Sequence, residues 1–263
     1  MSENLQIETI LQKKIDTGKK ALVVYITGGL GNEWIQTMHS VIDAGADVVE
    51  IGIPFSDPVM DGPVIQLANE SSMKSGTTPV SILNDLRGEN PAAPLAAMTY
   101  YNLAYRMGHE RFASGLSSAG ISGCILPDLP LEELDAWSDS AAKSNIETIL
   151  LAAPTAPDER LPIICEKSKG FIYGVGLLGV TGVRQELSAS AIEIATRLKK
   201  VTDLPVLVGV GVGTPDQAVE ASKASDGVVV GSAVVERMLN EGDPEKVGSL
   251  VREFRVALDE SVL

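Results

Sequence analysis

Aromatic residues and cysteines are both scarce in this sequence. Phe, Trp and Tyr make up 4% of the chain, whereas hydrophobic residues as a whole make up 44%. The apolar residues are therefore mostly Ala, Val, Ile and Leu, which favours close-packed parallel strands and helices over an aromatic-rich binding surface. The two cysteines, Cys124 and Cys165, form no disulfide framework and have no metal-ligand spacing. We expect two buried reduced thiols and no metal site.

Positive charge is also in short supply, because the formal net charge is −14. Such a chain lacks the basic surface that nucleic acid or an anionic membrane would need. No apolar run reaches the ~18 residues of a membrane helix, and residues 1–20 lack the apolar core of a secretory signal. We expect a cytoplasmic protein with no membrane or nucleic-acid partner. A small anionic substrate stays open, since backbone amides can bind phosphate whatever the net charge.

Short apolar runs alternate with helical patterns along the whole chain. We expect strands over 21–26, 47–53, 93–99, 123–126, 146–151, 171–175, 204–208 and 227–230. We expect helices over 3–17, 33–45, 63–75, 78–87, 108–118, 131–143, 157–167, 188–200, from 214, 233–240 and 244–260. Regular alternation predicts a parallel sheet with crossover helices. Eight such units in about 240 residues suit one α/β domain over 1–263, a (β/α)8 TIM barrel with an extra N-terminal helix. A doubly wound open sheet is the alternative.

The stretch 48–63 contains the strongest candidates for catalysis. Glu50 lies inside an apolar run of β-branched residues that predicts a buried strand, and burial should raise the pKa of its carboxyl group. Asp57 and Asp61 follow in one exposed Pro- and Gly-rich loop, near enough for one of them to reach the same substrate. The alternative is structural: an acid paired with Lys or Arg, followed by ordinary Asp-Pro and Asp-Gly turns.

Three glycine clusters near the end of the chain predict a phosphate site. They lie at 179–182, 209–213 and 231–232, and each follows an expected strand. Glycines let the backbone approach a phosphate closely, and a helix that opens at Ser232 would offer free amides to it. Barrels often bind phosphate with the loops after strands seven and eight. The alternative is that these glycines only make tight turns.

Two other patterns carry no function. Residues 174–179 match the dinucleotide fingerprint GxGxxG, but they lie deep in the chain and run into another loop instead of a helix. His39 and His109 have no Ser or Cys partner in a recognisable motif, so a nucleophilic triad is not expected. The residues alone therefore predict acid/base chemistry by carboxylates on a phosphorylated substrate.

Several blocks of the sequence together resemble one enzyme family. They are 25–29 (YITGG), 50–58 (EIGIPFSDP), 61–63 (DGP), 98–102 (MTYYN), 127–130 (PDLP), 179–182 (GVTG) and 231–233 (GSA). In this order they closely resemble the tryptophan synthase alpha chain family over nearly the whole sequence. The resemblance implies a (β/α)8 lyase that cleaves indole-3-glycerol phosphate to indole and glyceraldehyde 3-phosphate by a retro-aldol reaction.

The resemblance also implies roles for individual residues. Glu50 would be the general acid/base that moves a proton at indole C3, and Asp61 would hold the indole N–H. The remaining residues implied by the resemblance contact the rest of the substrate. Tyr173, Tyr100 and Thr181 would line the pocket, and the phosphate would lie at Gly182, Gly211, Gly231 and Ser232.

The family works with a partner, the tryptophan synthase beta chain, in an alpha2-beta2 heterotetramer. The resemblance implies that pyridoxal phosphate is bound by that beta chain and that this chain needs no cofactor. Leu30 and Leu177 depart from the family pattern, in loops that would close over substrate and contact the partner. A free-standing indole-releasing lyase, a phosphate-binding barrel without activity and a related isomerase barrel are the alternatives.

Overall fold

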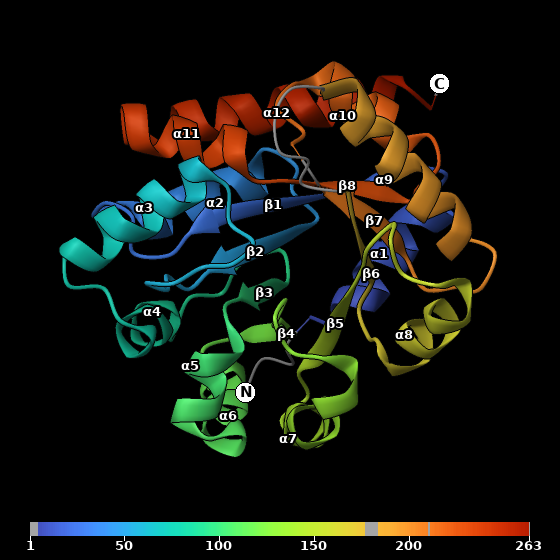
Figure 1. The fold of residues 1–263 in the computed structure, drawn as a ribbon. Coiled ribbons are helices and arrows are strands. Elements are labelled where there is room, and N and C mark those ends of the chain that lie inside the picture. The colour runs from blue at the N-terminus through green and yellow to red at the C-terminus, as the bar shows by residue number, and fades with distance from the viewer. Residues whose placement is uncertain (1–4, 177–183, 210, 263) are drawn as a thin grey trace.

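The computed structural model describes residues 5–176, 184–209 and 211–262, and for 184–189 the backbone alone. Within these ranges eight parallel strands close into a barrel in chain order, and helices surround it (Figure 1). The strands are β1 Ala21–Thr27, β2 Val48–Gly52, β3 Leu95–Met98, β4 Ile121–Ile125, β5 Glu147–Ala152, β6 Ile172–Val175, β7 Val206–Gly209 and β8 Gly227–Val230. The helices are α1 Ile7–Asp16, α2 Trp34–Asp43, α3 Pro63–Lys74, α4 Pro79–Leu86, α5 Tyr101–Met107, α6 His109–Ser118, α7 Asp135–Lys143, α8 Leu161–Lys167, α9 Arg184–Leu198, α10 Pro215–Ser222, α11 Ser232–Glu241 and α12 Pro244–Glu260.

The barrel is the fold that the alternation of strands and helices predicts. Pairing of β1 with β8, with Ala21 opposite Gly227, closes the sheet and rules out the open doubly wound alternative. Across the described ranges, no helix combines the length and the apolar character needed to cross a membrane. The extra N-terminal helix is present as α1.

The main differences from the predicted elements are one additional helix and the starting points of three others. The additional helix is α5, which is separated from α6 by Gly108, whose φ of 86° breaks the helical path. The helices expected from 131 and 157 begin as short 3-10 turns before α7 and α8, and the helix expected from 188 begins at Arg184. The strands lie where they were expected, to within a few residues at each end.

Helix α1 covers the N-terminal end of the barrel. Its buried Ile7 and Leu11 pack with Val23 of β1 and with Phe171, which lies just before β6. The carboxylate of Glu147 on β5 accepts hydrogen bonds from the Ile7 and Glu8 amides, at 2.7 and 3.1 Å. These amides begin a helix and have no partner within it, so Glu147 fixes α1 in place. The opposite end of the barrel is where the loops after the strands gather.

Strand pairing turns several polar side chains towards the inside of the barrel. Tyr25 of β1 is paired with Glu50 of β2, and Glu50 with Ala96 of β3. Tyr173 of β6 is paired with Leu207 of β7. Paired residues of neighbouring parallel strands face the same side of a sheet. Ala96, Leu207 and Tyr173 pack in the inner cluster with Val23, so Tyr25, Glu50 and Tyr173 all face inward.

Candidate active site

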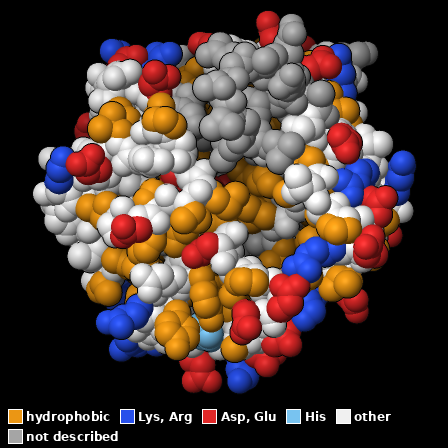
Figure 2. Space-filling model, viewed as in Figure 1, with side chains coloured by type: hydrophobic (Ala, Val, Ile, Leu, Met, Phe, Trp, Pro, Cys, Tyr) orange, Lys and Arg blue, Asp and Glu red, His pale blue; other side chains and the backbone are white. Residues whose placement is uncertain are grey.

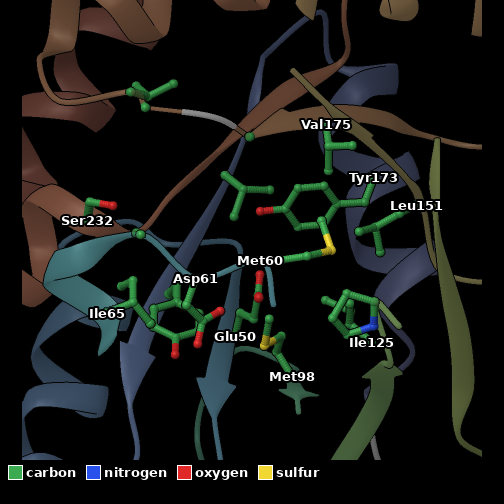
Figure 3. Close-up of a pocket in the computed structure, with 18 of the residues that line it drawn as sticks. Glu50, Met60, Asp61, Ile65, Met98, Ile125, Leu151, Tyr173, Val175 and Ser232 are labelled. Carbon is green, nitrogen blue, oxygen red and sulfur yellow. The ribbon is translucent and has the colours of Figure 1, made fainter. Parts of the chain in front are cut away.

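A cavity of about 250 Å³ opens among the C-terminal ends of the strands (Figure 3). Figure 2 shows hydrophobic side chains gathered around the hollow at the centre of this face. A few polar groups converge within this apolar wall, which is the usual build of a small-molecule site. The apolar wall includes Ile65, Met98, Ile125, Leu151, Val175 and Val229, and the polar groups are those of Tyr25, Glu50, Asp61, Tyr173 and Ser232.

Glu50 is a buried acid without a counter-charge. Its side chain is 3% exposed, and its Oε2 atom is buried with no hydrogen-bond partner in the described ranges. In the described part of the chain, no Lys or Arg forms an ion pair with it, which argues against the structural alternative. Burial first, and the charge of Asp61 second, raise the pKa of Glu50 to about 8. At neutral pH this group is therefore largely protonated and can give up its proton near that pH.

Asp61 lies just before α3 and is half-buried, where an exposed loop position was expected. Its Oδ1 accepts a hydrogen bond from the Tyr100 hydroxyl at 2.9 Å, and its Oδ2 accepts one from Asn69 Nδ2 at 2.9 Å. Burial raises the pKa of Asp61, and the bonds from Tyr100 and Asn69 lower it. Figure 3 shows Asp61 and Glu50 together at the same side of the cavity. Two acids in different environments can thus take different roles.

The structure separates the two loop acids. Asp57 is exposed, accepts a hydrogen bond from Ser56, and does not line the cavity. Tyr100 does not line the cavity either: it is 2% exposed and meets the site through Asp61. Its role as a direct substrate contact stays a prediction.

Two tyrosines lie across the cavity, each against a strand glycine. The hydroxyl of Tyr25 lies where a side chain on Gly52 would stand, and a Cβ on Gly209 would be 2.6 Å from the Tyr173 hydroxyl. Burial raises the pKa of both phenols, so both stay neutral donors. Tyr25 is not among the site residues expected from the sequence, since its place in an apolar run and in the block 25–29 gives it no role of its own.

Replacing Gly52 by Ala should displace Tyr25 and destabilise the protein by about 1–3 kcal/mol, the usual cost of overpacking. Urea denaturation measures this loss. The matched control is Gly213→Ala, because a Cβ at Gly213 would meet nothing nearer than 3.5 Å. An equal effect of the two substitutions would contradict the close seating of Tyr25.

Three of the four expected phosphate residues line the cavity. Gly211 follows β7, and Gly231 and Ser232 follow β8. Ser232 is the first residue of α11, so amides without partners inside the helix begin there. Gly211 has a φ of 61°, which favours glycine. Thr181 and Gly182 lie outside the described residues, as does Leu177.

The histidines and cysteines take no part in the cavity. His39 Nε2 lies 2.8 Å from a Glu89 oxygen, and His109 Nε2 lies 3.0 Å from the Tyr101 hydroxyl. Cys124 and Cys165 are buried free thiols, as expected. Where the structure describes the chain, no three His, Cys, Asp or Glu side chains group in a way that could hold a metal ion.

Comparison with known proteins identifies the family. The family model described as tryptophan synthase alpha chain matches residues 11–260. The chain belongs to the tryptophan synthase alpha chain family. It is 41% identical to the tryptophan synthase alpha chain of Streptomyces coelicolor over 249 residues, or 92% of each chain. It is 41% identical to that of Methanocaldococcus jannaschii over 222 residues, or 83% of this chain and 79% of the relative.

Solved structures of the family share the same fold. A Mycobacterium tuberculosis tryptophan synthase structure superposes with a TM-score of 0.88 at 32% identity, covering 97% of this chain and 99% of that chain. The tryptophan synthase alpha chain of Legionella pneumophila gives a TM-score of 0.86 at 33% identity, covering 97% and 98%. Family membership therefore extends over the barrel and over the loops that carry Glu50 and Asp61.

Proposed function

We propose that this chain is a cytoplasmic lyase that cleaves indole-3-glycerol phosphate to indole and glyceraldehyde 3-phosphate, the alpha half-reaction of tryptophan synthase. The observation that carries the proposal is the pair of acids in one cavity of a family member. The buried Oε2 of Glu50 has no hydrogen-bond partner among the described residues, burial raises the pKa of Glu50 to about 8, and Asp61 accepts hydrogen bonds from two donors. We take residues 1–263 as one catalytic domain.

Glu50 starts the reaction as the acid, because it holds its proton at neutral pH. It gives this proton to indole C3, and the ring becomes a cation whose N–H faces the Asp61 carboxylate. The bond from C3 to the glycerol chain then breaks and its electron pair returns to the ring. The proton of the adjacent glycerol hydroxyl passes to Glu50 as the aldehyde forms. Both acids end as they began, so the cleavage asks for no cofactor in this chain.

The phosphate of the substrate would lie against Gly211, Gly231 and Ser232, which line the cavity after β7 and β8. Backbone amides and the N-terminus of α11 suit a dianion. No Lys, Arg or His is among the described residues that line the cavity, so neutral hydrogen-bond donors would bind the phosphate there. We assign Thr181 and Gly182 to the same substrate, as pocket and phosphate contacts, and Tyr173 to the pocket wall.

The partner of this chain would be a tryptophan synthase beta chain in an alpha2-beta2 heterotetramer. The beta chain would hold pyridoxal phosphate and join the released indole to serine. A structure described as tryptophan synthase is among the similar solved structures, which supports this partnership.

Indole release from indole-3-glycerol phosphate, measured with and without an added beta chain, tests the function. We expect release by the chain alone and a sharp rise with the beta chain, because closure of loops by a partner completes many active sites. Fast release that the beta chain leaves unchanged would favour the free-standing lyase. Binding of substrate without any indole would contradict the proposal and favour a binding barrel.

A further inference from the structure

Asn69, on the buried face of α3, reaches Asp61 rather than the cavity. Its side chain is 3% exposed and is not part of the cavity wall. Its Nδ2 atom donates to Asp61 Oδ2 at 2.9 Å, whereas its Oδ1 atom is buried and meets no hydrogen-bond partner among the residues that the structure describes. The neighbours of Asn69 on this face are Ile65, Ala68 and Ser72.

The orientation of the Asn69 amide follows from the chemistry of its partner. An ionised carboxylate only accepts hydrogen bonds, so the NH2 group must face Asp61 and the carbonyl oxygen must point away. A buried acceptor without a partner costs free energy that an apolar side chain would avoid. An amide at this position is therefore explained by the donor that it brings to Asp61.

Asn69 and Tyr100 hold the two oxygens of Asp61 from different elements. Tyr100, at the start of α5, donates to Oδ1 and also accepts the Met60 amide at 3.1 Å. Gln66 Nε2 donates to the Asp61 backbone oxygen at 2.7 Å. Each carboxylate oxygen keeps a further lone pair after these bonds, which leaves the carboxylate able to accept the substrate N–H.

No positive charge offsets that of Asp61 among the described residues of the cavity. The titratable groups that face it are Glu50 on β2, Tyr25 on β1 and Tyr100, and none of them is a cation. Burial raises the pKa of Asp61, and the bonds from Tyr100 and Asn69 oppose that rise. Neutral hydrogen-bond donors therefore stabilise the charged carboxylate of Asp61, as a Lys or Arg does in many sites.

We propose that Asn69 is a positioning residue that keeps the Asp61 carboxylate oriented and ionised for the reaction. The inference rests on the proposed function, and it names a residue that touches neither the cavity nor the reacting atoms. Asn69→Leu, which is close to Asn in size, removes the donor and the unpaired acceptor together.

In Asn69→Leu, the acidic limb of the pH profile of kcat/KM for indole release should move up by about one to two pH units. The loss of a hydrogen bond to a charged group commonly shifts the pKa of that group by this amount. At pH 7 kcat should fall by roughly 10- to 100-fold while KM changes little, because the lost interaction serves the transition state. Asn69→Asp should move the limb further in the same direction, since it adds a like charge.

The matched control is Ser72→Ala. Ser72 lies on the same buried face of α3 and donates to the Gly28 oxygen at 2.9 Å, without contact to Asp61. The Ser72→Ala substitution should lower the free energy of unfolding in urea and leave the acidic limb of the pH profile where it is in the wild type. An unmoved limb in both Asn69 variants, or an equal shift in Ser72→Ala, would overturn the inference.

A carbon-13 NMR titration of the Asp61 carboxyl group separates the inference from the proposed function. It needs no turnover, and the signal is assigned by its loss in Asp61→Asn. In Asn69→Leu the Asp61 titration should move to higher pH. A protein that releases no indole but shows this shift would refute the proposed function alone, and an unchanged titration would refute the role of Asn69.

Discussion

Replacing Glu50 by Gln should reduce indole release by roughly 10²- to 10⁴-fold, the usual contribution of general acid/base catalysis. Gln keeps the size and shape of the protonated acid but has no proton to give at neutral pH. Among the described residues, no group is hydrogen-bonded to the buried Oε2 of Glu50 and so placed to take over its proton transfer. Steady-state indole formation at saturating substrate measures the loss. Turnover within 10-fold of the wild-type rate would contradict the role of Glu50.

The control for Glu50→Gln is its stability, which should rise relative to wild type as pH increases. The pKa of Glu50 is raised from 4.5 to about 8 by folding. A raised pKa means that the stabilising, protonated form is fully present below pH 4.5 and is lost as pH rises through 8. Between pH 4.5 and pH 8 the free energy of unfolding of the wild type should fall by up to about 5 kcal/mol relative to that of Glu50→Gln.

Urea denaturation of both proteins at pH 5, 7 and 9 tests this difference. A gap that widens with pH shows that Glu50 is neutral and buried, and also that the inactive variant is well folded. Parallel stability curves at all pH values would mean that Glu50 is solvated or paired, contrary to its place in the cavity.

The different protonation behaviour of the two acids follows from the hydrogen bonds that each of them accepts. None of the described residues donates a hydrogen bond that would favour the charged form of Glu50, so burial dominates and the proton stays. Asp61 receives two such bonds, which oppose the effect of burial. The same residue chemistry thus yields an acid and a carboxylate within one cavity.

The strands and the two acids of the cavity could be predicted because their signals are local. An apolar run of β-branched residues predicts a buried strand, and an acid inside it is conspicuous, as at Glu50. The glycines after β7 and β8 likewise predict a phosphate site from local sequence; Gly211 and Gly231 line the cavity, and phosphate binding there stays a prediction.

The residues that could not be predicted depend on contacts between distant elements. Asn69 is one polar residue in a helical pattern, and nothing in its spacing shows that it points to Asp61. Tyr25 lies within an apolar strand, and only the pairing of β1 with β2 sets it against Gly52. Helix α5 was missed because Gly108 and a short helix together look like a loop.

Replacing Asp61 by Asn should reduce kcat for indole release by roughly 10²- to 10³-fold, comparable to the loss of one preorganised electrostatic group. The amide is neutral and cannot stabilise the cationic ring. It also offers one acceptor oxygen where Asp61 accepts bonds from both Tyr100 and Asn69, so one donor loses its partner. Rapid-quench or steady-state measurement of indole gives the change in kcat.

Asp57→Asn is the matched control, because it makes the same chemical change in the same loop. Asp57 is exposed and outside the cavity wall, so its loss should leave kcat within a few-fold of wild type. If Asp57→Asn were the more damaging of the two, the loop would have to rearrange on binding substrate and bring Asp57 to the indole. The two acids are only four positions apart, but the hydrogen bonds from Tyr100 and Asn69 select Asp61.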